Sequence, residues 1–124
     1  MRSTKANDAC LEVVAQLDQL RFLDLTKQSV EDRYMINDTG ARKLSSLKHL
    51  AWINLSNTAI SDDTLLVLQT NCLDLEHVDI SSCIYVKDLG IGHLMKLKLK
   101  ALDISRCLLV TEHAIHTLAT NEKS

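Results

Sequence analysis

The sequence predicts an α/β solenoid of about four strand–helix repeats, with a parallel sheet on the concave side and helices on the convex side. Composition gives the first indication. Leucine occurs 22 times in 124 residues, whereas Phe, Trp and Tyr together make up 3% and proline is absent. A core of this size usually uses several aromatic side chains for buried area. This composition therefore favours a core built by repetition.

The second indication is an internal repeat of the form L-x-x-L-x-x-L-D-L-T, in which the closing apolar pair is expected to form a buried strand. The copies begin at Leu17, Leu47, Cys72 and Lys96. Their first strand positions are Leu23, Ile53, Val78 and Leu102, which lie 30, 25 and 24 residues apart. The first spacing is the longest because extra residues around Lys27 to Tyr34 separate the strand from the next helix.

Each copy continues with an apolar residue, a helix-capping residue, an acid and a helical stretch. We expect strands near residues 21–25, 51–55, 76–80 and 100–104, each followed by a helix. Asn37, Ser61 and Thr111 are suitable N-caps, and the acids after them favour the positive end of a helix. The predicted organisation is a capping helix within 1–16 (near 8–16), repeats over 17–46, 47–71, 72–95 and 96–119, and a tail over 120–124.

The third and fourth copies carry a cysteine after the strand. Residues 75–88 and 99–112, with Cys83 and Cys107, resemble the cysteine-containing class of leucine-rich repeat, best known from F-box substrate receptors of ubiquitin ligases. Gln28 and Thr58 stand where the first two copies should have the cysteine. Residues 1–16 have room for one helix, so we expect no F-box before the repeats and carry over the fold alone. The chain is also similar to short mitochondrial proteins related to ATP synthase coupling factor B.

Composition and charge also indicate which partners and cellular locations to expect. The net charge is −2, and apolar runs fall far short of the ~20 residues of a membrane helix, so we expect neither nucleic-acid binding nor membrane insertion. Four cysteines without a C-x-x-C pair indicate reduced thiols rather than a disulfide scaffold. With no secretory signal, we expect an intracellular, reducing location, cytoplasmic or nuclear, with the mitochondrion as an alternative.

Strand alternation predicts which side chains line the open concave face. Three columns should cross the sheet there, because the apolar strand positions face the core. The aromatic column is Phe22, Trp52, His77 and Ala101; the acidic column is Asp24, Asn54, Asp79 and Asp103; the hydroxyl column is Thr26, Ser56, Ser81 and Ser105. The predicted partner-binding residues are Phe22, Trp52, His77, Asp24, Asn54, Asp79 and Asp103.

Each column has a structural and a functional interpretation. The acidic and hydroxyl columns can hydrogen-bond one another as part of the repeat, or form an acidic stripe that receives a basic partner. Phe22 and Trp52 can form a binding hot spot, since exposed aromatic residues on rigid surfaces are enriched there. Alternatively, Trp52 packs over the extra residues that follow the first strand.

No catalytic residue, metal or cofactor is predicted. His77, Asp79 and Ser81 share one strand face, but successive same-face positions lie ~6.6–7 Å apart, too far for a hydrogen-bonded relay. Cys83 and Cys107 are expected to be buried, rather than zinc ligands together with the histidines of the last helix. Lys96, Lys98 and Lys100 form a solvated edge or a small basic contact patch.

These observations favour a non-enzymatic protein-interaction module, an adaptor or scaffold that binds a protein partner through the concave face. The alternative is a subunit or assembly factor of a larger complex. The last repeat is expected to lack a capping repeat, which would leave Ile104, Val110, Ile115 and Leu118 in an apolar patch. Self-association or docking through that end is then expected.

Overall fold

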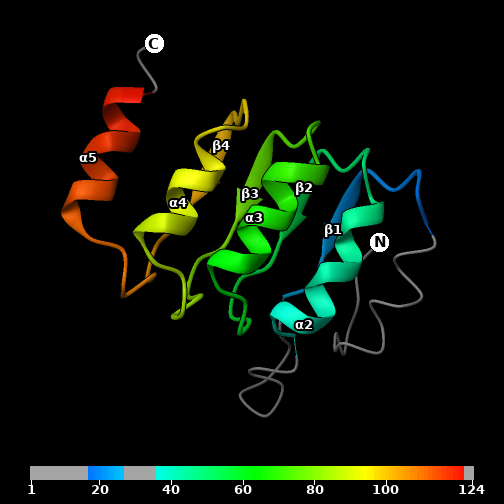
Figure 1. Cartoon of the computed structure of the whole chain (residues 1–124), viewed down its shortest axis with the longest axis horizontal. Coiled ribbons are helices and arrows are strands. Elements are labelled where there is room, and N and C mark those ends of the chain that lie inside the picture. The colour runs from blue at the N-terminus through cyan, green and yellow to red at the C-terminus, as the bar shows by residue number, and fades with distance from the viewer. Residues whose placement is uncertain (1–16, 27–35, 122–124) are drawn as a thin grey trace.

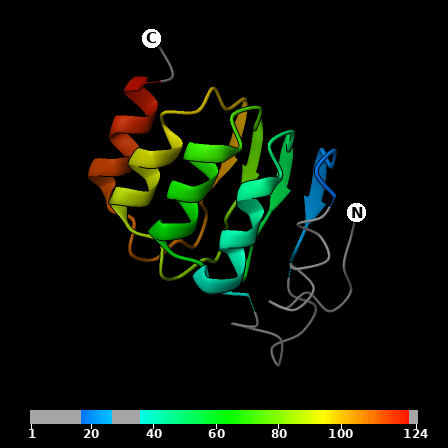
Figure 2. The ribbon, with the colours of Figure 1, turned by 45° about the vertical axis from the view of Figure 1, so that its right-hand side comes forward.

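The computed structural model describes residues 17–26 and 36–121. Four parallel strands form one sheet in the order of the chain: β1 (Phe22–Asp24), β2 (Trp52–Asn54), β3 (His77–Asp79) and β4 (Ala101–Asp103). A helix follows each strand: α2 (Asp38–Ala41) continuing as the 3-10 helix η2 (Arg42–Ser46), then α3 (Asp62–Asn71), α4 (Asp88–Leu94) and α5 (Glu112–Asn121). The helices form one layer and the strands the other (Figures 1 and 2). The predicted solenoid is therefore confirmed.

The strands pair in the register that the repeat predicts. Phe22 pairs with Trp52, Trp52 with His77, and His77 with Ala101. The acidic column is aligned in the same way, because each strand contributes three residues and ends on its Asp or Asn. Each strand lies within the range expected from sequence, one residue shorter at both ends.

The core lies between the sheet and the helices. Both apolar residues of each of the first three strand segments are at most 3% exposed, and the inner faces of the helices meet them. The strand residues are Leu23, Leu25, Ile53, Leu55, Val78 and Ile80; the helix residues include Leu44, Leu65, Leu68, Ile91 and Leu94. Because full burial of such a side chain is worth roughly 1.5–3 kcal/mol, leucine repetition replaces aromatic bulk in this core.

Helix α2 begins as its sequence predicts. The side chain of Asn37 accepts hydrogen bonds from the backbone N–H groups of Thr39 and Gly40. Ser61 holds the N-cap position of α3, but its side chain makes no cap hydrogen bond. Its hydroxyl instead donates to Asp38 Oδ2 in the preceding repeat. Ser61 is therefore the N-cap residue of α3, as predicted, but its side chain does not accept a hydrogen bond from the first turn of that helix.

The acid that opens each of α2, α3 and α4 forms a forward link, by which we mean that its carboxylate accepts a hydrogen bond from the backbone N–H at the start of the next helix. Asp38 Oδ1 accepts from Ser61 N at 2.8 Å, and Asp62 Oδ1 accepts from Lys87 N at 2.8 Å. Asp88 Oδ1 accepts from Thr111 N at 2.8 Å. The acids thus join consecutive repeats, in addition to favouring their own helix ends.

Gly90 makes room for one of these links. A Cβ atom at this position would lie 2.3 Å from Asp62 Oδ1 and 2.8 Å from Leu65 Cδ1. At Gly92, two residues further along α4, a Cβ would meet no atom within 4 Å. Helices α3 and α4 can therefore pack this closely because residue 90 has no side chain.

The cysteines provide links in the opposite direction. Cys83 Sγ donates to Leu55 O and Cys107 Sγ to Ile80 O, both at 3.1 Å and both to the preceding strand segment. Thr58, which replaces the cysteine in its copy, donates to Leu55 O of its own repeat at 2.7 Å. Burial raises the pKa of Cys83 to about 11 and also raises that of Cys107. The expectation that these thiols are buried is confirmed.

The last described repeat is less well covered. Leu102 and Ile104 are only partly buried, and β4 has both its Ala and its Asp exposed. Ile104 therefore packs against the core without being fully buried as Leu55 and Ile80 are. The described residues include no neighbour on the outer side of β4.

Some expectations lie outside the described residues: the helix near 8–16, Cys10, Gln28, most of the extra residues after the first strand, and the last residues of the tail. Within residues 17–26 and 36–121, no helix is long and apolar enough to cross a membrane.

Candidate protein-binding face

The first feature of the concave face is a stacked aromatic pair. The rings of Phe22 and Trp52 lie 3.9 Å apart between centroids, with 10° between their planes. They stack because the two residues are direct partners on β1 and β2. Phe22 is 42% exposed and Trp52 is half-buried. The stack therefore holds two large aromatic side chains in one fixed arrangement at the surface.

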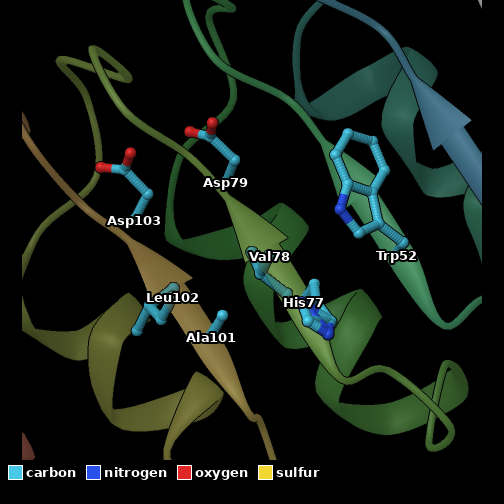
Figure 3. A pocket seen from close by; sticks show the side chains of 7 residues that line it. All are labelled: Trp52, His77, Val78, Asp79, Ala101, Leu102 and Asp103. Atoms are coloured by element: carbon cyan, nitrogen blue, oxygen red, sulfur yellow. The ribbon is translucent and has the colours of Figure 1, made fainter.

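Beside this pair lies a hollow of about 220 Å³. Its lining comes from β2, β3 and β4: Trp52, His77, Val78, Asp79, Ala101, Leu102 and Asp103. Figure 3 shows Trp52 at one side, and Asp79 and Asp103 next to each other near the carboxyl ends of β3 and β4. The small side chain of Ala101 leaves the space that a larger residue would fill. Sequence alternation assigned Val78 and Leu102 to the core, and their place in the lining was not predicted.

Asp79 and Asp103 each hold the turn that follows their strand. Asp79 Oδ1 accepts from Ser81 N at 2.9 Å and from Ser81 Oγ at 2.7 Å. Asp103 Oδ1 accepts from Ser105 N and Oγ at the same two distances. The hydrogen bonds from the Ser105 backbone and hydroxyl lower the pKa of Asp103. This carboxyl is therefore ionised at neutral pH.

The two N-terminal positions of the acidic column use the same turn. Asp24 Oδ1 accepts from Thr26 N and Oγ1, and Asn54 Oδ1 accepts from Ser56 N at 2.9 Å. Ser56 Oγ donates to Thr26 Oγ1 at 3.4 Å, which joins two repeats. Hydrogen bonding between the acidic and hydroxyl columns is thus present, mainly within each repeat.

The hydrogen bonds of Ser81 also bear on catalysis. Its hydroxyl donates to Asp79 rather than to a histidine, so it is not arranged as an activated nucleophile. Across residues 17–26 and 36–121, no group of three or more His, Cys, Asp or Glu side chains is placed to hold a metal ion.

Charge separates the concave face from its surroundings. The three columns contain three Asp and no Lys or Arg, whereas the whole chain has 14 basic and 16 acidic residues. Lys100, at the amino end of β4, pairs with Glu76 Oε2 at 3.2 Å. Lys96 and Lys98 are exposed, in agreement with a solvated edge. The face itself is therefore acidic.

Parallel strands stacked in chain order, leucines on the inner positions and, in the third and fourth repeats, a cysteine that hydrogen-bonds to the preceding strand segment are the arrangement of a short leucine-rich-repeat solenoid. Over 119 residues the chain is 31% identical to F-box/LRR-repeat protein 4 of Bos taurus, and the match covers 92% of this chain. The chain spans 18% of the length of that relative. No protein-family model matches the chain. The similarity is consistent with a protein–protein interaction module.

Proposed function

We propose that this chain is an adaptor or scaffold that binds a protein partner through its concave face. The observation that carries this proposal is the Phe22–Trp52 stack beside the hollow on a rigid parallel sheet. Aromatic side chains that are held in place lose little conformational entropy on binding, and they are enriched among the residues that dominate interface energies.

We propose a protein rather than a nucleic acid as the partner because of the charge of this face. The three columns contain Asp24, Asp79 and Asp103 and no Lys or Arg. A phosphate backbone would meet carboxylates there, whereas nucleic-acid affinity depends on Lys and Arg contacts.

The test compares two truncations of exposed apolar side chains. A partner is first identified by affinity purification with the parent chain, and its Kd is then measured with purified components. Trp52→Ala should weaken binding by about 2 kcal/mol or more, the usual threshold for a hot spot. Leu89→Ala is the control, because Leu89 is 67% exposed on α4 in the helix layer. Equal affinities of the Trp52→Ala variant and the parent would refute the proposal.

A second function is favoured by the last repeat. Leu108 is 74% exposed, Leu109 46% and Ile115 52%, next to the partly buried Ile104 and Val110. Exposed apolar groups of this kind suit a subunit or assembly factor that docks into a larger complex.

Light scattering over a concentration series tests this docking surface. We expect the parent to self-associate and Ile115→Glu to reduce the association, with Leu89→Glu on α4 as the control. A parent that stays monomeric at all concentrations would favour the adaptor function.

A further inference from the structure

We propose that the hollow beside Trp52 binds an arginine side chain of the protein partner, held between the indole ring and the carboxylates of Asp79 and Asp103. This inference rests on the proposed function, since it assumes that the concave face binds a protein. It adds the chemical class of the group that is recognised.

The carboxylates have an acceptor atom to spare. The hydrogen bonds from Ser81 and Ser105 all go to the Oδ1 atoms of Asp79 and Asp103. Within the described residues, no hydrogen bond or ion pair reaches the Oδ2 atom of either side chain. A carboxylate has about four lone-pair sites in total. Each can therefore hold its turn through one oxygen and accept from a ligand through the other.

The two carboxylates are also neighbours. Asp79 and Asp103 are direct partners on β3 and β4, and adjacent strands lie ~4.8 Å apart. Like charges directly opposite each other are unfavourable on a sheet. A cation that enters between them removes this repulsion and forms two charge-assisted hydrogen bonds.

The ring of Trp52 forms the remaining side of the proposed site. Phe22 covers the face of the Trp52 ring on the β1 side, so the opposite face borders the hollow toward β3. A guanidinium group stacks on such a face, and tryptophan is the best partner for it. The indole nitrogen lies on the side of the ring nearer to β3 (Figure 3). Its N–H can donate to a backbone carbonyl of the bound peptide.

Shape favours arginine over lysine. The hollow of about 220 Å³ has room for a long side chain. The planar guanidinium presents its donors as a fork that can reach two carboxylates, whereas a lysine ammonium is a compact point charge.

The acidic column itself supplies a conservative substitution for the test. Asn54 occupies the equivalent position on β2 and still accepts from the backbone N–H two residues further on. Asp79→Asn and Asp103→Asn should therefore keep both turns while removing the two charges. The matched control is Asp18→Asn with Asp63→Asn, which removes the same charge from two exposed positions outside the concave columns.

The experiment uses three blocked five-residue peptides, Gly-Ser-X-Ser-Gly, in which X is arginine, its neutral isostere citrulline, or lysine. Binding is followed by NMR chemical shifts of the Trp52 indole N–H and of the backbone amides of residues 77–79 and 101–103. We expect saturable shifts with the arginine peptide, and affinities at least about tenfold weaker for the other two. The Asp79→Asn/Asp103→Asn variant should lose at least tenfold in affinity for the arginine peptide, and the control variant should retain the parent value. Equal binding of the citrulline or lysine peptide, or equal loss in the control variant, would overturn the proposal.

A separate outcome concerns the proposed function. If Trp52→Ala weakens binding of the identified partner but Asp79→Asn/Asp103→Asn leaves it unchanged, the concave face is the interface and arginine recognition is wrong. If neither variant changes partner affinity, the concave face itself is not the interface.

Discussion

The third and fourth repeats have similar sequences, yet they bury equivalent residues to different extents. In the third repeat Val78 is 3% exposed and Ile80 and Cys83 are fully buried. In the fourth repeat, the equivalent residues Leu102 and Ile104 are only partly buried, and Cys107 is 6% exposed. On the following helix, Ile91 is fully buried whereas Ile115 is 52% exposed.

The difference shows that burial in one repeat depends on the repeats beside it. The third repeat has described neighbours on both sides, and the fourth has one. Each repeat therefore buries apolar surface against both the preceding and the following unit, as expected when stability is a sum of repeat and interface contributions. The amino-acid pattern alone does not determine burial.

The largest effect should come from the paired isoleucines of the two repeats. Ile80→Ala should lower the free energy of unfolding by roughly 2–5 kcal/mol, because it leaves a cavity at a fully buried position. Ile104→Ala, at a partly buried position, should cost about half as much. Urea denaturation of both variants and the parent measures the change in the free energy of unfolding. Equal losses would show that the fourth repeat is as well packed as the third.

The next effect concerns the joint between α3 and α4. Gly90→Ala should destabilise the protein by roughly 1–3 kcal/mol, since the new methyl group overlaps Asp62 Oδ1. Gly92→Ala on the same helix should instead stabilise it by about 0.5–1 kcal/mol, because its Cβ meets nothing and alanine favours the helix. Thermal or urea unfolding of the two variants gives the sign of each change. A stabilising Gly90→Ala would mean that the forward link from Asp62 is not part of the packed joint.

Thiol labelling should reveal a smaller, local difference between the repeats. In a Cys10→Ser background, we expect iodoacetamide to modify Cys107 at least about tenfold faster than Cys83, because the fourth repeat opens at a lower free energy. Cys72 and Cys83 are fully buried with a pKa of about 11, which suppresses their thiolate forms. Mass spectrometry of the labelled peptides measures the rates. Labelling of Cys83 as fast as Cys107 would contradict the comparison.

The smallest effect is expected from the pH dependence of the forward links. Burial raises the pKa of Asp38, but hydrogen bonds from Ser61 and Thr64 outweigh it and the pKa is lowered. Because the pKa of Asp38 is lower in the folded state, the link contributes its full stability to the fold at pH values above the unfolded-state pKa of about 3.9. This contribution is lost as the pH falls through the folded-state pKa. Stability of the parent should therefore decrease below about pH 4, and less steeply in Asp38→Asn.

Asp88 offers the same measurement in the joint to the fourth repeat. Hydrogen bonds from the hydroxyl and backbone of Thr111 lower its pKa. An NMR titration of the side-chain carboxyl carbons should give values below 3.9 for both Asp38 and Asp88. A value for Asp88 at or above 3.9 would indicate that the link to the fourth repeat is open in solution.

Sequence predicted the sheet and its columns because strand alternation has a period of two and each copy repeats it. The pairing of Phe22 with Trp52, and of Asp79 with Asp103, follows directly from aligning the copies. The concave position of the candidate site was therefore available from sequence. That this site binds a partner stays a prediction.

Other features depended on the distance between repeats, which a sequence pattern does not contain. The acids after the caps were interpreted as partners of their own helix ends, and their bonds to Lys87 N and Thr111 N were not foreseen. Nothing in the sequence indicated the left-handed backbone at Ser82 and Arg106, where φ is near 60°, because neither residue is glycine. The hollow itself required the small size of Ala101 to be combined with the bulk of Trp52 two strands away.

The links between repeats also make it possible to remove or add a whole repeat. The joints between the second and third repeats and between the third and fourth have the same two hydrogen bonds: a helix-opening carboxylate accepts from the next unit, and a thiol donates to a carbonyl of the previous one. If residues 72–95 were excised, Asp62 would face the Thr111 N–H in place of Lys87 N, and Cys107 would face Leu55 O in place of Ile80 O. Both pairs already exist in equivalent form, so the cut ends match. A gene that encodes such units can lengthen or shorten by whole copies and keep the same contacts between repeats.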